Sequence, residues 1–354
     1  MTQRPFLSWA RRPTASCAPI FLLVAATLTW AADDFLPLMR KAEGRKEPEE
    51  RVLYFTRAIA AWTPAHGNGL LANCLFRRGE ASYEAYDFAG ALPDLGQALD
   101  FDPRNARAYF LRGMIRLHQA RSEKTGAANL SRLASQAARD LAEYAALNPG
   151  DCEGLLALGQ AQVLAGRSGE ALGTFTSAQR LIPSDPRPRL GAGRAFMAAR
   201  DLDRAQASLD EADALARGRD AEVLTERAVC RAARGDETGA LADYDRALPR
   251  HEDVIADMVR SRAHPADIAE RRAAAGRAYY GRGRIRESRG DKAGARDDYQ
   301  AGCRHGHEPC CRRARALAAA KGPPPLRVAP PRKPKPRKKI PNPKSSPGDR
   351  IYAH

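Results

Sequence analysis

The chain has 354 residues, 44% of them apolar, and is rich in alanine and arginine, a composition that favours buried helices over sheets. Its net charge of +16 is uneven, because residues 1–32 carry +3 and residues 321–354 carry +9. Only +4 remains for residues 33–320, which argues against a folded, specific nucleic-acid binder.

Residues 1–32 have the organisation of a secretion signal peptide. Three arginines between positions 4 and 12 precede an apolar run of 13 residues, from Ile20 to Ala32. A membrane-spanning helix needs about 20 such residues, and the small side chains at the end of this run suit a cleavage site. The sequence therefore predicts an exported protein, periplasmic or secreted. An uncleaved inner-membrane signal anchor is the alternative.

Small residues and prolines recur along residues 50–320 at an interval of 34. Identical residues stand 34 positions apart in several pairs: Gly79 and Gly113, Gly159 and Gly193, Ala171 and Ala205, and Pro149 and Pro183. This period is typical of stacked helix–turn–helix hairpins. The expected fold class is therefore all-α.

The repeat unit is clearest between residues 155 and 186. Its apolar, small, aromatic and proline positions are Leu155, Gly159, Ala171, Phe175, Ala178 and Pro183. These residues resemble the tetratricopeptide-repeat (TPR) family. The resemblance implies an α-solenoid of about six helical hairpins, each covering the apolar side of the next. The implied repeat-core positions are Gly79, Ala91, Gly113, Gly159, Ala171, Phe175, Gly193, Ala205 and Ala240.

Two stretches depart from the repeat. An insertion at residues 119–136 is compatible with helix, so we expect lengthened helices there rather than a loop. Residues 249–275 contain Pro249 and Pro265 and are expected to be irregular. The predicted division is a signal peptide at 1–32, solenoid repeats at 33–248, an irregular connector at 249–275, a last repeat with a capping helix at 276–320, and a basic tail at 321–354.

In the TPR family the concave face usually carries function, and its side chains come mainly from the first helix of each hairpin. The resemblance implies a mixed apolar and cationic partner-binding groove formed by Phe76, Tyr83, Arg107, Phe110, Met114, Arg187, Arg194, Tyr280 and Arg284. Arginine and aromatic side chains are common anchors for peptides, so the expected partner is a protein or peptide. The alternative is that these side chains pack against neighbouring helices.

A cysteine-rich motif, YQAGCRHGHEPCCRRARAL, occupies residues 299–317 of the last repeat. It resembles the Sel1-like repeats of exported cysteine-rich proteins. The resemblance implies a disulfide between Cys303 and Cys311, with Cys310 as the alternative partner. A metal site with His305 and His307 competes with this interpretation, although the spacing matches no usual zinc pattern. Unpaired thiols are a third interpretation.

The tail at 321–354 contains ten Lys or Arg residues, one Asp and many prolines. Such a composition predicts a disordered, extended segment. It would act as a tether to an anionic envelope surface, such as membrane lipid or cell-wall polymer, or only as a solubilising tail.

Motifs for catalysis or cofactor binding are weak. The sequence has no dinucleotide fingerprint, phosphate loop or nucleophile elbow, so neither a cofactor nor an enzyme is expected. Acidic pairs such as Asp297–Asp298 have the pattern of solvated helix faces. The favoured function is an exported scaffold for protein–protein interaction. An envelope-associated structural protein and a Sel1-like enzyme acting on cell-wall compounds are the alternatives.

Overall fold

The computed structural model describes residues 35–122 and 126–319, and within these ranges all regular secondary structure is helical. The predicted signal peptide and basic tail lie outside the described residues. The elements, in order, are α2 (Phe35–Glu43), α3 (Pro48–Ala61), the 3-10 helix η1 (Pro64–His66), α4 (Asn68–Glu84), α5 (Phe88–Phe101), α6 (Ala106–Arg121), α7 (Ala127–Leu147), α8 (Cys152–Leu164), α9 (Ser168–Leu181), α10 (Arg187–Ala198), α11 (Leu202–Ala216), α12 (Ala221–Ala233), α13 (Glu237–Arg260), α14 (Pro265–Ser288), α15 (Lys292–Arg304) and α16 (Glu308–Ala319). None of these helices has the length and apolar character needed to cross a membrane.

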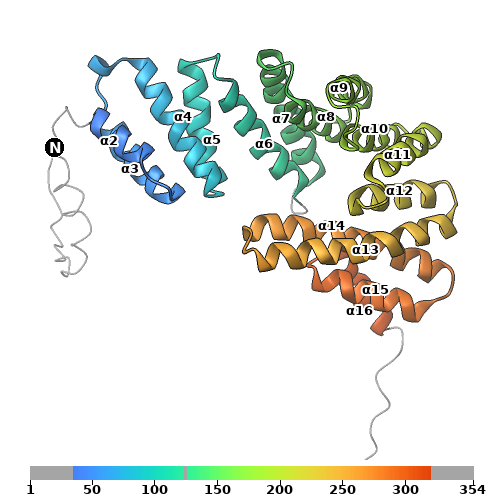
Figure 1. Cartoon of the computed structure of the whole chain (residues 1–354). Helices are drawn as coiled ribbons and strands as arrows, with labels where there is room; N and C mark the ends of the chain where they lie inside the picture. Colours follow the sequence, from blue (N-terminus) through green and yellow to red (C-terminus); the bar gives the residue numbers. More distant parts are fainter. Residues whose placement is uncertain (1–34, 123–125, 320–354) are drawn as a thin grey trace, which may run out of the picture.

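The helices from α4 to α15 pair into six antiparallel hairpins, as the sequence predicts, and α16 covers the end of the last one (Figure 1). The first helix of each hairpin also packs against the first helix of the next, from α4 through to α14. The second helices do not pack against one another to a comparable extent within the described residues. The array therefore curves, with the first helices on its inner side, and forms an α-solenoid.

Turn chemistry explains where the helices of each hairpin begin and end. Several first helices are followed by a glycine with positive φ, as at Gly166, Gly235 and Gly290, because glycine adopts this backbone at no steric cost. Several second helices begin after an aspartate whose carboxylate accepts a hydrogen bond from a backbone N–H of the first turn, as Asp87 does from Gly90. These local signals set the hairpin spacing.

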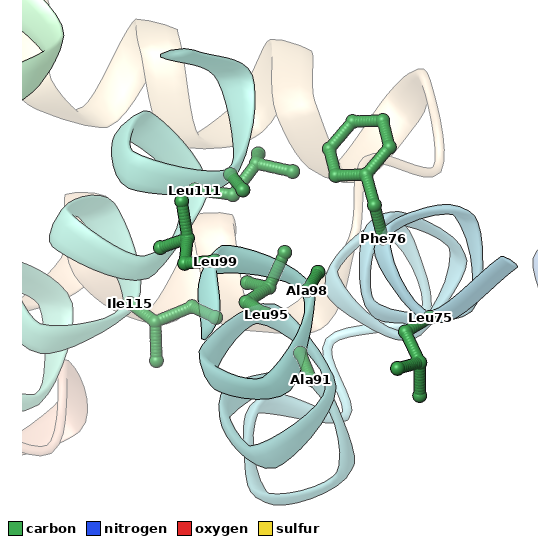
Figure 2. Close-up of a cluster of buried hydrophobic side chains, with 9 residues drawn as sticks. Leu75, Phe76, Ala91, Leu95, Ala98, Leu99, Leu111 and Ile115 are labelled. Atoms are coloured by element: carbon green, nitrogen blue, oxygen red, sulfur yellow. The ribbon is translucent and has the colours of Figure 1, made fainter. Parts of the chain in front are cut away.

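Close contacts between small and large residues hold the helices of each hairpin together. The ring of Phe175 in α9 lies between two glycines, Gly159 in α8 and Gly191 in α10. A methyl group on Gly159 would lie 2.5 Å from this ring, and one on Gly191 would overlap it further. The same kind of contact pairs Gly79 with Leu95. Figure 2 shows Leu95 among the buried side chains that join α4, α5 and α6.

The predicted repeat-core positions lie where helices cross. Their alanines are fully buried: Ala91, Ala171, Ala205 and Ala240. Their glycines each face a large side chain of the second helix: Gly79 faces Leu95, Gly113 faces Leu141, Gly159 faces Phe175 and Gly193 faces Leu209. The small residues of the repeat therefore set the distance between helices.

A buried arginine–aspartate pair joins the two helices in four of the six hairpins. In each, an arginine directly before the small crossing residue donates two hydrogen bonds to an aspartate directly before the large core residue. The pairs are Arg78–Asp94, Arg112–Asp140, Arg227–Asp243 and Arg282–Asp298, with shortest separations of 2.6 to 2.7 Å. Asp297 and Asp298 were expected to lie on a solvated helix face. This was wrong for Asp298, whose carboxylate is buried and accepts hydrogen bonds from Arg282.

The two departures from the repeat are largely helical. The insertion extends α7 to 21 residues, against 14 in α5 and α9, as expected. The prediction of an irregular connector at 249–275 was wrong, because only residues 261–264 separate α13 from α14. Pro249 lies inside α13, and Pro265 occupies the first position of α14, where its missing N–H has no helical partner in any case. Both helices have 24 residues.

Candidate functional site

The long helices α13 and α14 belong to successive repeats but also pack against each other as an antiparallel pair, here called the α13–α14 hairpin, which runs back across the inner side of the curved array (Figure 1). Side chains at its turn contact Tyr86 in the turn between α4 and α5. The ring of Tyr86 stacks on His264 with centroids 3.4 Å apart and planes 2° from parallel. The Tyr86 hydroxyl donates to Asp267 Oδ2 at 2.5 Å. Nearby, Arg121 at the end of α6 pairs with Glu270 of α14 at 3.3 Å. The first helices of the repeats therefore lie on one side of the inner face, and the α13–α14 hairpin lies on the other.

The predicted apolar groove residues differ in the solvent exposure of their side chains. Phe76 is only 9% exposed and belongs to the core that joins α4 to α6 (Figure 2). Phe110 is half-buried, with its ring 4.9 Å from that of Tyr144. Tyr83 and Met114 are half-buried as well. Phe76 therefore acts as a core residue, whereas the other three present part of their side chains at the surface.

The predicted groove arginines already have partners on neighbouring helices. Arg107 lies 3.6 Å from Glu80 of α4, and its guanidinium stands over the ring of Phe110. Arg187 lies 2.7 Å from Glu153 of α8 and equally close to Asp185. The prediction of a cationic groove therefore needs correction at these positions, because intramolecular carboxylates balance the guanidinium charges.

Among the predicted groove arginines, Arg194 has two carboxylate partners on one neighbouring helix. It donates to Glu222 at 2.6 Å and to Glu226 at 2.8 Å, both in α12. Burial raises the pKa of Glu222, but the guanidinium of Arg194 and the charges of Arg121 and Arg271 outweigh this and lower the pKa to about 2. The centre of the inner face is thus a network of opposite charges contributed by α6, α10, α12 and α14.

Tyr280 and Arg284 lie together near the end of α14, in a shallow hollow completed by Glu287, Ser288 and Arg313. Glu287 accepts hydrogen bonds from Arg313 at 2.7 Å and from the hydroxyl of Tyr299. The carboxylate is therefore satisfied within the protein. The hollow adjoins the capping helix α16, and its residues do not take part in the charge network around Arg194.

The cysteine-rich motif joins α15 to α16. Cys303 and Cys311 form a disulfide that links the end of α15 to the first turn of α16. Closing so short a loop stabilises the folded chain by about 2–3 kcal/mol in the loop-entropy account. His305 faces Glu252 at 2.7 Å, and His307 lies 3.2 Å from the thiol of Cys310. In the described part of the chain, no three His, Cys, Asp or Glu residues are placed to hold a metal ion.

A buried histidine makes folding stability depend on pH. His251 in α13 is 4% exposed and lies 3.0 Å from the hydroxyl of Thr225. Burial lowers the pKa of His251 from 6.5 to about 4. Between these values the unfolded chain binds a proton that the folded chain does not, so stability is lost as pH falls through this window. We expect a loss of about 3 kcal/mol, measured by urea unfolding from pH 6.5 to pH 4.

The variant His251→Gln should show a flatter dependence over the same range, because glutamine does not titrate. The matched control is His118→Gln, since His118 is exposed at the end of α6. An unchanged slope in His251→Gln would show that other groups cause the loss. The low pKa of Glu222 affects stability only at lower pH, below about 4.5.

Tyr86, His264 and Asp267 were not singled out by the sequence. The sequence nevertheless marks Tyr86 as unusual. It stands seven residues after Gly79, at the turn position where other hairpins have a glycine, Gly166 or Gly235. The buried arginine–aspartate pairs were missed too. They recur at a fixed register beside the core positions, 16 residues apart except where the insertion separates them further.

Known proteins resemble this chain in repeat pattern and in fold. A family model described as tetratricopeptide repeat matches residues 76–131, 126–186 and 190–254. A solved tetratricopeptide repeat protein from Parabacteroides merdae is similar with a TM-score of 0.59 and 16% identity, over 80% of this chain and 99% of that one. This likeness shows the same fold. No curated protein matches the chain.

Two further solved structures are similar to a shorter part of the chain. A thermophilic TPR protein in Thermus thermophilus has a TM-score of 0.40 and 22% identity, covering 58% of this chain and 98% of that one. The structure of MamA has a TM-score of 0.41 and 17% identity, covering 49% of this chain and 95% of that one.

Proposed function

Because the chain belongs to the tetratricopeptide-repeat family, we propose that it is a protein-binding scaffold without an active site of its own. The family generally mediates protein–protein interaction. The partner would bind on the inner face, which the first helices form continuously from α4 to α12. This continuity is the observation that carries the proposal, since it offers one extended surface rather than separate patches.

The chemistry of the inner face favours an apolar or amphipathic segment as the ligand. Phe110, Met114 and Met197 are half-buried on first helices and leave apolar surface between the ion pairs. The arginines beside them are already paired, so a strongly acidic peptide would have to compete with Glu153 and Glu222. An amphipathic helix would cover the apolar surface without breaking these pairs.

Photo-crosslinking in intact cells tests this proposal. A benzoylphenylalanine replaces Met114 on α6, and in a matched protein it replaces Glu143, which is exposed on the second helix of the same hairpin. We expect a discrete adduct with a protein only from position 114. Equal adducts from both positions, or none from position 114, would contradict binding on the inner face.

We also propose that the scaffold works outside the cytoplasm. The pattern of residues 1–32 supports export, and the Cys303–Cys311 disulfide supports an oxidising compartment. Sequencing the N-terminus of the purified protein separates cleavage from anchoring. A start just after Ala32 supports a cleaved signal peptide, whereas an intact N-terminus in the membrane fraction supports the anchor.

We also propose a second interaction, in which the basic tail at 321–354 binds an anionic envelope surface while the inner face binds the partner segment. Its charge of +9 supports this role, because clustered Lys and Arg residues are attracted to acidic surfaces at moderate salt. Deleting residues 322–354 should abolish co-sedimentation with acidic phospholipid vesicles and leave the crosslink from position 114 intact. Sedimentation that survives the deletion would exclude the tail as the tether.

A further inference from the structure

The contact between the α13–α14 turn and the α4–α5 turn closes the solenoid into a ring. Tyr86 and Asp267 are 181 residues apart in sequence, and the hairpins that carry them are not neighbours in the array. We call Tyr86, His264 and Asp267 the clasp. His264 also caps α14, because its Nδ1 accepts a hydrogen bond from the backbone N–H of Ala266. Capping holds the imidazole ring in the orientation on which Tyr86 stacks.

The backbone at Tyr86 shows that the tyrosine side chain is kept there at a cost. Its φ is 58°, in the left-handed region that disfavours side chains, whereas Gly166 and Gly235 occupy the same turn position in other hairpins. A glycine at this position would satisfy the turn without strain. Arg200 has the same backbone in the α10–α11 turn, so what distinguishes Tyr86 is the set of contacts that its side chain makes in the clasp.

The ring closure differs from every other junction in the solenoid. Each buried apolar cluster in the described residues is confined to successive helices, so none spans the junction between α4–α6 and the tip of α13–α14. Side-chain contacts hold that junction instead. They include the Tyr86 stack, the Tyr86–Asp267 hydrogen bond and the Arg121–Glu270 pair, in which both partners are substantially exposed.

We propose that the α13–α14 hairpin is a strap that closes the inner face, and that the ring opens and closes at the clasp. Separating the clasp uncovers no apolar core, so opening leaves both flanking hairpins intact. In the closed state the strap stands beside the α4 end of the inner face, since Asp267 accepts a hydrogen bond from Tyr86 just after the end of α4. Opening widens access to that end. Opening and closing at the clasp require no bound partner.

Electron–electron distance measurement between two spin labels tests the strap on the full chain. Nitroxides are attached through keto amino acids at Ala89 of α5 and Val259 of α13, two exposed positions on either side of the clasp, so the native cysteines stay unlabelled. The chain with an intact clasp should show one short, narrow distance. Tyr86→Gly should replace it by longer, broader distances in most molecules, while the helix content is unchanged.

The matched control is Arg200→Gly. Arg200 has the same turn position in the α10–α11 hairpin, with φ of 64°, but it lies away from the clasp. This variant should keep the short distance. The proposal is overturned if Tyr86→Gly also keeps it, if Arg200→Gly loses it equally, or if the intact chain already shows broad distances. Tyr86→Phe, which keeps the ring but loses the hydroxyl, gives a second test and should open the ring only partly.

Discussion

Asp243→Ala is expected to lower the free energy of unfolding by about 3–5 kcal/mol, because it leaves a buried guanidinium without its main partner. The Asp243 side chain is 1% exposed and accepts two hydrogen bonds from Arg227. It also forms an ion pair with Arg231 at 2.9 Å. Arg227 also reaches Asp213 of the preceding hairpin at 2.7 Å. Losing Asp243 therefore weakens the contact between α12 and α13 and strains the junction with α11.

Urea unfolding followed by helical circular dichroism measures the effect, and the melting temperature should fall by about 10 °C. Asp253→Ala is the control, since Asp253 is exposed on the same helix. The double variant Arg227→Met with Asp243→Leu should recover part of the loss, because it removes the most deeply buried guanidinium together with its carboxylate, although Asp213 and Arg231 each lose a partner. If Asp243→Ala were no worse than Asp253→Ala, the buried pairs would have no structural role.

Phe175→Ala should lose a comparable amount, about 3–5 kcal/mol, for a different reason. The phenyl ring is 2% exposed and fills the space between Gly159 and Gly191, so it joins two successive hairpins at once. Neither glycine has a side chain that could fill the cavity left by the ring. The surrounding helices would have to move together to close it.

The neighbouring change Thr176→Ala serves as the control, because Thr176 is exposed and its hydroxyl bonds only to the backbone of Leu172. Thermal unfolding compares the two variants. Nearly equal melting temperatures would mean that the cavity closes without loss of stability and that the phenyl ring of Phe175 does not join the hairpins.

The stacked hairpins could be predicted from sequence because each repeat carries its own contacts. Small residues such as Gly159 and large ones such as Phe175 return at a period that encodes packing between neighbours. The prediction of an irregular connector at 249–275 was wrong because neither of its prolines interrupts a helix. A proline at the first helical position, as at Pro265, is compatible with helix, and the sequence alone did not show that Pro249 would be tolerated inside α13.

The pairing of the arginines on the inner face could not be predicted from the repeat register. The repeat register places Arg107 and Arg194 on first helices, but it does not show that Glu80 and Glu222 of neighbouring hairpins would balance them. The clasp is harder still to predict. A repeat pattern describes contacts between successive hairpins, whereas Tyr86 and His264 meet only through the accumulated curvature of the array and the extra length of α13 and α14.

The two hairpins without a buried arginine–aspartate pair are α8–α9 and α10–α11, in the middle of the array. Leu158 and Thr174 stand at the paired positions of the first, and Ala192 and Ser208 at those of the second. The two helices of each of these hairpins are therefore held together without a buried ion pair, by packing around Phe175 and Leu209, whereas in the other four hairpins a buried ion pair adds to the packing.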